Sequence, residues 1–192
     1  MIEIPASYNY CSAFLTFACN LKCPYCINKY NGLYKYDHME IDDWVEGLRR
    51  IRTTPDLPIT LSGGEPTLYR GFCYIINRCE EYFDVLTNGE FDPRWFASKV
   101  EPNRLWRGAR YSSIRFSYHP HQTNPVMLLL KVRYLLSKGY SVGIWAVDNK
   151  DPIIRRVGTV AKLLGIDFRL KEFLDDKHGS YKYPAGLDGK RK

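Results

Sequence analysis

The feature of this sequence that most restricts its fold is a repeated alternation between short apolar segments and amphipathic segments. Six segments have the composition and length of strands, namely 10–17, 59–61, 83–86, 113–118, 140–147 and 167–171. Helical patterns or helix-start signals lie between them, over 42–52, 68–82, 93–100, 124–138 and 152–164. Strands that alternate with helices favour a parallel sheet with right-handed crossovers. The sequence therefore predicts an α/β fold of about six βα units, too few for a closed eight-stranded barrel.

Two of these segments carry predictions about burial. The segment 10–17 is largely apolar, so we expect a strand buried on both faces. The segment 124–138 is the strongest helix, and its predicted buried face is the set Val126, Leu129, Leu130, Arg133 and Leu136.

A cluster of cysteines follows directly after the first predicted strand. Cys19, Cys23 and Cys26 lie within eight residues at the spacing CxxxCxxC. A loop this short can place three sulfur atoms around one face of a metal centre. That is one ligand short of a closed tetrahedral zinc site or a fully ligated four-iron cluster, so the centre stays open to a substrate or cofactor. The alternative, three core or disulfide cysteines, gives no reason for this spacing.

Two more motifs follow the second and third predicted strands, Gly63-Gly64-Glu65-Pro66 and Thr87-Asn88-Gly89. With the cysteine motif, and in this order, they resemble the radical SAM superfamily, whose CxxxCxΦC motif has an aromatic residue where this chain has Tyr25. The resemblance covers roughly residues 10–171. It implies a partial TIM-like barrel, an open (βα)6 three-quarter barrel, with its site at the C-terminal ends of the strands.

The resemblance also implies the chemistry. Cys19, Cys23 and Cys26 would bind three irons of a [4Fe-4S] cluster, and the fourth iron would chelate S-adenosylmethionine (SAM). Once a reductant such as flavodoxin or ferredoxin has reduced the cluster, SAM is split into methionine and a 5′-deoxyadenosyl radical that abstracts hydrogen from a substrate. The implied activity is that of an oxidoreductase or lyase acting on a small molecule or a peptide. The cofactors carry this chemistry, while the protein orients them and excludes water.

Family members bind the methionine amino group of SAM with the motif after the second strand. Gly63 and Gly64 let the backbone approach closely, and Glu65 or neighbouring carbonyls would be the acceptors. Tyr25 would lie near the adenine, and Asn88 would orient the nucleoside or the substrate. A plain turn is the alternative for either motif.

Later strands supply more candidates. Ser117 would contact the ribose hydroxyls or the methionine carboxylate, and the backbone of 145–147 would contact adenine. A cation for the carboxylate is expected, and Arg115, Arg169 and Lys171 compete for this role. Strand alternation places Arg169 and Lys171 on one face.

Two histidines also lie beyond the fourth predicted strand. His119 and His121 are ordinary loop histidines by default, although one of them could contact substrate or move a proton.

The pattern indicates one radical SAM core domain over residues 1–174, with residues 1–9 as an irregular lead-in. Residues 28–39 are polar and are expected to form a loop. The polar, basic tail 175–192 has no periodicity, so we expect it to be extended or disordered, or to be the cut end of a longer chain. No cysteine follows Cys79, which leaves no ligand for an auxiliary cluster in that part of the sequence.

Composition limits the partners. The formal charge of +7 favours an anionic substrate or nucleic acid, although a solvated lysine-rich surface explains it equally well. RNA could bind the aromatic and basic loop 104–111, but this loop matches no known module. No segment has the roughly 18 apolar residues of a membrane helix, and the N-terminus lacks the features of a signal peptide. Clustered free cysteines indicate a reducing compartment, here the cytoplasm.

Three functions therefore compete. The leading one is a radical SAM enzyme that acts on a small molecule or peptide. An activase that installs a glycyl radical on a partner enzyme would also be small, but such activases favour other residues around their cysteines. A non-catalytic protein would hold a cluster or SAM without cleaving it, and the intact motifs argue against this third function.

Overall fold

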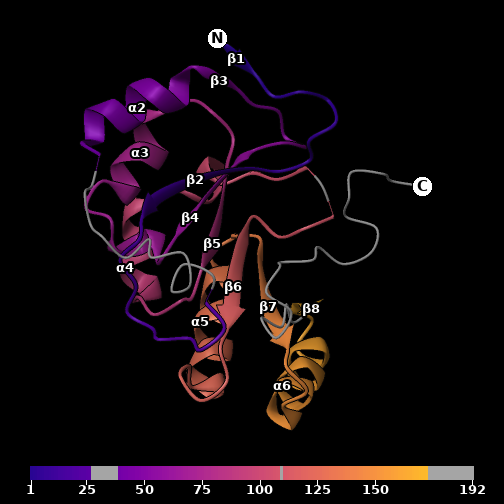
Figure 1. Ribbon diagram of the computed structural model, residues 1–192. Coiled ribbons are helices and arrows are strands. Elements are labelled where there is room, and N and C mark those ends of the chain that lie inside the picture. The colour runs from indigo at the N-terminus through magenta and orange to yellow at the C-terminus, as the bar shows by residue number, and fades with distance from the viewer. Residues whose placement is uncertain (27–38, 109, 173–192) are drawn as a thin grey trace.

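A computed structural model describes residues 1–26, 39–108 and 110–172 (Figure 1). Six parallel strands form one sheet in the order β2-β4-β5-β6-β7-β8, with β2 and β8 at its two open edges. The strands are β2 (Cys11–Thr16), β4 (Ile59–Gly63), β5 (Phe83–Thr87), β6 (Ile114–Tyr118), β7 (Val142–Asp148) and β8 (Asp167–Glu172). The predicted α/β fold, an open partial barrel of parallel strands, is therefore confirmed.

Five helices connect the strands. They are α2 (Ile41–Arg49), α3 (Phe72–Arg78), α4 (Pro93–Lys99), α5 (Pro125–Ser137) and α6 (Pro152–Leu163). Three of them begin at an Asp-Pro or Asn-Pro pair, where the Asp92, Asn124 or Asp151 side chain accepts a hydrogen bond from a backbone N–H of the first turn. These sequence signals explain why the predicted starts of these helices agree with the structure to within one residue.

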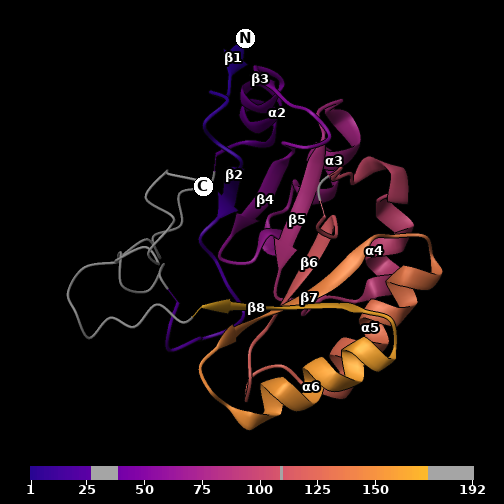
Figure 2. The ribbon, with the colours of Figure 1, turned by 90° about the vertical axis from the view of Figure 1, so that its right-hand side faces the viewer.

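The two faces of the sheet have different surroundings. The helices pack along one side (Figures 1 and 2), and the core between them and the sheet includes Leu61, Val85, Ile114 and Ile144. We call this side the outer face. The opposite, inner face carries the alternate residues of each strand, and many of these are polar. Those used below are Ser12, Thr60, Ser62, Asp84, Arg115, Ser117, Trp145, Arg169 and Lys171.

Several predictions of detail are wrong. Strand β2 is not buried along both faces, since Phe14 on the inner face is 41% exposed and no helix of the described residues covers that side. The helix predicted over 42–52 ends at Arg49, and Ile51–Arg52 forms a short strand, β3. This strand pairs in parallel with β1 (Ile2–Glu3), in a segment predicted to be irregular.

The face predicted for α5 is buried only in part, because Leu129 and Leu136 pack against the core whereas Val126 and Leu130 do not. Its buried residues are Leu128, Val132 and Leu135, whereas Val126 is 63% exposed and Leu130 is exposed as well. The helix is apolar around most of its circumference, so periodicity alone cannot select the side that faces the sheet. The predicted loop 28–39 and the tail 175–192 lie outside the described residues, apart from Met39.

Candidate functional site

The cysteine loop begins where β2 ends, at the edge of the sheet where β4 and β5 also end. Cys19 and Cys26 are partly buried, Cys23 is buried, and all three are free thiols. The backbone N–H of Cys26 donates to the carbonyl of Cys23 at 3.1 Å, which closes a turn between the second and third cysteines. The described part of the loop therefore presents all three sulfur-bearing residues beside the C-terminal ends of the strands.

The two glycines after β4 hold the entrance of this loop. The Gly64 N–H donates to the carbonyl of Thr16 and the Glu65 N–H donates to the carbonyl of Ala18, both at 2.7 Å. A Cβ atom at Gly63 would lie 2.1 Å from the Thr16 oxygen, and one at Gly64 would lie 2.2 Å from the Ala18 oxygen. Gly63 also has φ 137°, in the region that favours glycine. The close backbone approach predicted for this motif is made to the cysteine loop itself.

The Glu65 carboxylate joins the end of β4 to the end of β5. It is fully buried and accepts hydrogen bonds from the N–H and hydroxyl of Thr67, the hydroxyl of Thr87 and the N–H of Asn88, at 2.6–3.2 Å. Burial raises the pKa of Glu65, and these four donors oppose that shift. Both carboxylate oxygens thus accept from protein donors, Oε1 from three of them and Oε2 from one.

Asn88 connects the motif after β5 to the first cysteine. Its side-chain amide donates to the Asn20 side chain at 2.7 Å and lies 3.8 Å from the Cys19 sulfur. The Leu21 N–H donates to the same sulfur at 3.4 Å. Donors of this kind favour a thiolate over a thiol and tune a sulfur-bound metal. The three sequence motifs therefore form one connected network around Cys19.

Burial opposes ionisation of the cysteines. It raises the pKa of Cys19, despite the two N–H donors, and raises that of Cys23 to about 11. Cys19 and Cys23 are accordingly neutral thiols at neutral pH, and a metal that binds them would release their protons. Among the described residues, no three His, Cys, Asp or Glu side chains converge on a point suited to one metal ion. A four-iron cluster has its ligands on separate irons, so three thiols spread along one loop suit it better than a single zinc ion.

The segment after β6 covers the other side of the loop. The Tyr25 hydroxyl hydrogen-bonds to His119 Nδ1 at 3.0 Å, and the two rings stack with centroids 5.8 Å apart. The Gln122 side chain accepts from the Lys22 N–H at 2.7 Å. Sequence reasoning named Tyr25 and considered His119, but Gln122 and Asn20 carry no signal that it could have used.

In the described part of the chain, the candidates on later strands make no hydrogen bond to the cysteine loop, although Ser117 follows Phe116, the partner of Thr87, and is thus level with Asn88. Ser117 is half-buried on the inner face, in register with Trp145. The Arg169 guanidinium bonds to Asp167 at 3.0 Å and stacks over the rings of Tyr111 and Trp145. Arg115 binds Asp84 at 2.8 Å.

Lys171, the last of these candidates, lies on β8 opposite Val147, two strands away from Arg115. Desolvation of its ammonium and the Arg115 charge lower the pKa of Lys171. Four of the later-strand candidates thus share the inner face, while Asn88, Glu65 and Tyr25 gather at the cysteines.

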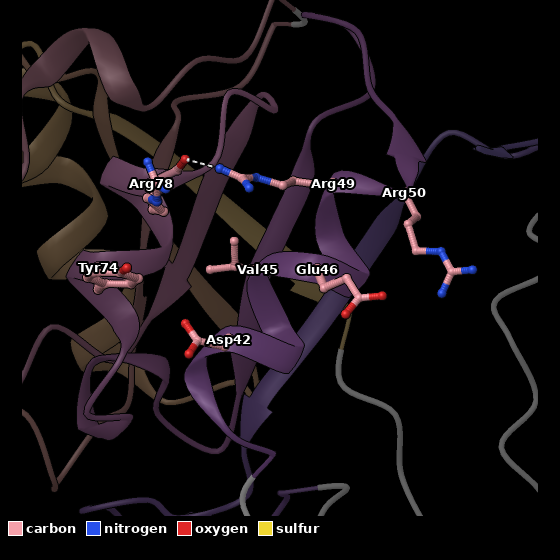
Figure 3. Close-up of a pocket in the computed structure, with 7 residues that line it drawn as sticks. All are labelled: Asp42, Val45, Glu46, Arg49, Arg50, Tyr74 and Arg78. Carbon is pink, nitrogen blue, oxygen red and sulfur yellow. Dashed lines mark hydrogen bonds between the residues drawn. The ribbon is translucent and has the colours of Figure 1, made fainter.

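A separate hollow of about 530 Å³ lies on the helical side, between α2 and α3 (Figure 3). Its lining residues are Asp42, Val45, Glu46, Arg49, Arg50, Tyr74 and Arg78. The Arg49 side chain donates to the carbonyl of Arg78 across it, at 3.1 Å. None of the three motifs contributes to this hollow, so it is not the site that they define.

Comparisons with known proteins agree with a site formed by the three motifs. The model of the radical SAM superfamily matches residues 14–101, a segment that contains all three motifs. An S-adenosylmethionine-dependent nucleotide dehydratase of Thermoplasmatales archaeon (strain ISO4-H5) is 27% identical over 99 residues, which are 50% of this chain and 35% of the relative. The PqqA peptide cyclase of Methylorubrum extorquens (strain PA1) is 32% identical over 80 residues, which are 40% of this chain and 21% of the relative. The chain thus matches about a third or less of the length of these relatives.

Solved structures show the same fold. Streptococcus suis SuiB has a TM-score of 0.61 at 18% identity, over 91% of this chain and 42% of SuiB. The native anSMEcpe structure with bound AdoMet and the Cp18Cys peptide has a TM-score of 0.60 at 16% identity, over 86% of this chain and 51% of that one. Residues 14–101, which hold all three motifs, thus match the radical SAM superfamily, and the chain shares the fold of these solved structures.

Proposed function

We propose that this chain is a radical SAM enzyme whose Cys19, Cys23 and Cys26 hold a [4Fe-4S] cluster that binds SAM. The observation that carries the proposal is the network in which Gly64 and Glu65 bond to the loop entrance and Asn88 reaches the Cys19 sulfur. The family match over 14–101 supports it. When bound, such a cluster supplies the electron that cleaves SAM and yields a 5′-deoxyadenosyl radical able to abstract hydrogen from a substrate.

The residues of the chain then have defined tasks. The donors to the Cys19 sulfur offset the negative charge that builds up on the thiolates, and the buried Glu65 fixes the distance between the ends of β4 and β5. Tyr25, held by His119, offers an aromatic surface beside the cysteines for the adenine. The backbone carbonyls near Gly63 and Gly64 would accept from the methionine amino group, and Ser117 is a candidate for the ribose hydroxyls.

The substrate in this proposal is a peptide or a small molecule. A peptide cyclase and a nucleotide dehydratase among the relatives support these two classes. The cluster would take its electron from a flavodoxin or ferredoxin, and free thiols favour the cytoplasm as the place of action. The longest described helix, α5, has 13 residues, and none in the described ranges is long and apolar enough to cross a membrane.

Anaerobic reconstitution tests the proposal. The protein is loaded with iron and sulfide, reduced with dithionite and given SAM, and 5′-deoxyadenosine is measured by chromatography with mass detection. Cys23→Ala should lose the product, whereas Cys73→Ala, a partly buried cysteine of α3, should keep it. Product from Cys23→Ala at the wild-type level would exclude the assigned ligands. A wild-type cluster that never cleaves SAM would instead favour the non-catalytic function.

A further inference from the structure

The inner face contains a buried carboxylate shared by two arginines. Asp84 on β5 is fully buried, Arg115 on β6 binds one of its oxygens at 2.8 Å, and Arg107 from the loop before β6 binds the other. The two arginine side chains are only 8% and 6% exposed. One negative charge therefore faces two positive charges in a place where water screens them poorly.

The described residues do not supply a hydrogen-bond acceptor for every N–H group of these two arginines. The Nε atoms of Arg107 and Arg115 are both buried without a hydrogen-bond partner among the described residues. Buried polar groups are usually satisfied, and an unpaired one in a folded protein calls for an explanation such as a bound ion or ligand. Two unpaired donors on neighbouring guanidinium groups point to a missing acceptor with negative charge.

A third cation lies on the same face, two strands from Arg115 and further towards the C-terminal ends of the strands. Lys171 on β8 faces the same side of the sheet, and the Arg115 charge contributes to the lowered pKa of Lys171. Lys171 makes no ion pair with any described residue, in contrast to Arg169, which Asp167 neutralises. Asp84 is thus shared by the two arginines alone, and Lys171 adds a further positive charge to this face. Burial also lowers the pKa of Arg115, as expected for a guanidinium that lacks enough counter-charge.

The position of Asp84 separates its two arginines from the cysteine loop. Asp84 lies near the start of β5, and Asn88, four residues later and just beyond the end of this strand, is the residue that reaches Cys19. At the rise of a strand, this places the Asp84 level about 13 Å from the Asn88 level. An anchor at that depth suits the far end of a substrate better than a group bound at the cluster.

We propose that Arg107, Arg115 and Lys171 form an anion subsite on the inner face that binds a carboxylate or phosphate group of the substrate. The inference rests on the proposed function, because it gives the substrate of that reaction a negatively charged group. Guanidinium groups with free N–H donors suit the planar carboxylate and the oxygens of phosphate, and Lys171 adds a mobile point charge.

Isothermal titration of the reconstituted 192-residue chain tests the subsite. The probes are inorganic phosphate and acetate, each added with and without saturating SAM. The wild type should bind at least one of them saturably, with SAM present as well as absent. Arg107→Gln and Lys171→Gln should each weaken binding about tenfold or more, whereas Arg49→Gln, which removes a cation of the α2–α3 hollow, should not. Tighter binding of phosphate would identify a phosphorylated substrate, and tighter binding of acetate a carboxylate such as a peptide terminus.

Three results would overturn the inference. They are the lack of saturable binding to the wild type, equal weakening in Arg49→Gln, and loss of binding when SAM is added, since that would assign the cations to the SAM carboxylate. Unfolding curves of all variants show that each is folded. Formation of 5′-deoxyadenosine is measured on the same wild-type samples. SAM cleavage without anion binding removes only the subsite, while anion binding without SAM cleavage removes the proposed function.

Discussion

The two faces of the six-stranded sheet differ in chemical character, since the outer face is apolar and the inner face is largely polar. On the outer face, Ile59, Leu61, Val85, Ile114 and Ile144 are buried against the helices, and this apolar burial stabilises the fold. On the inner face, hydroxyl groups, a shared carboxylate and several cations replace them. Adjacent residues of one strand belong to these different settings, as Ile114 and Arg115 do on β6. The sheet thus alternates apolar and largely polar surroundings at a period of two residues.

Substitutions on the two faces should therefore act through different mechanisms. Loss of an outer side chain removes apolar burial and leaves a cavity. Loss of an inner side chain changes the balance of charge, and its cost depends on which charges remain unpaired.

The largest effect is expected on the inner face, at the carboxylate shared by two arginines. Asp84→Asn should lower the free energy of unfolding by about 3 to 5 kcal/mol, because two buried guanidinium groups lose their counter-charge. Asp167→Asn is the control, since this carboxylate is 33% exposed and should cost less than about 1 kcal/mol. Urea unfolding measures both. Equal costs would mean that the Asp84 cluster is not a buried charge network.

An outer-face substitution should cost nearly as much by a different mechanism. Ile114→Ala should lower the free energy of unfolding by about 2 to 5 kcal/mol, since a fully buried side chain leaves a cavity. Val126→Ala on α5, where the side chain is exposed, should change it by about 0.5 kcal/mol or less. If Val126 proved as costly as Ile114, the buried face of α5 would be misplaced.

A smaller effect is expected from the protonation of His119, which hydrogen-bonds to Tyr25 in the cysteine loop. Burial lowers the pKa of His119 from the ordinary 6.5 to about 4, so the folded protein keeps this imidazole neutral. The unfolded chain takes up a proton below pH 6.5, so the free energy of unfolding should fall as pH decreases from about 6.5 to about 4. His119→Asn should lose this part of the pH dependence. An NMR titration of iron-free protein that finds an ordinary pKa for His119 would contradict its burial against Tyr25.

The smallest effect should be a gain in stability away from both faces. Gly47 lies within α2, is exposed, and has no atom within 4 Å of where a Cβ would be. Gly47→Ala should therefore raise the free energy of unfolding by about 1 kcal/mol, since alanine favours a helix over glycine. Thermal unfolding measures this change. A loss of stability would show that α2 is packed differently from the structure described.

The sequence predicts the order of strands and helices because each strand is short and apolar and several helices start at Asp-Pro or Asn-Pro. The three motifs are also short and contiguous, so the sequence alone is enough to predict the match to the family. It does not predict which side of the apolar helix α5 is buried. It also misses the polar inner face, because the apolar residues of β2 gave no sign that the described helices all lie on the other side.

Long-range contacts account for the remaining differences. The Asp84 and Arg107 pair joins residues 23 apart, and the contact of Gln122 with Lys22 spans 100 residues. No local pattern encodes such contacts. For Glu65 the sequence suggested a ligand role, while the structure shows a carboxylate occupied by Thr67, Thr87 and Asn88. Only the fold reveals that these donors surround it.

The central claim is that the motif after β4 seats the cysteine loop so that it can bind a cluster. The most direct test compares iron bound per chain after anaerobic reconstitution in Gly64→Ala, in Gly47→Ala and in the wild type. A Cβ at position 64 would lie 2.2 Å from the Ala18 carbonyl and 2.6 Å from that of Phe17, so the loop entrance has to move. We predict that Gly64→Ala keeps its circular dichroism spectrum but binds little iron, while Gly47→Ala binds as much as the wild type. Full iron binding by Gly64→Ala would contradict the claim.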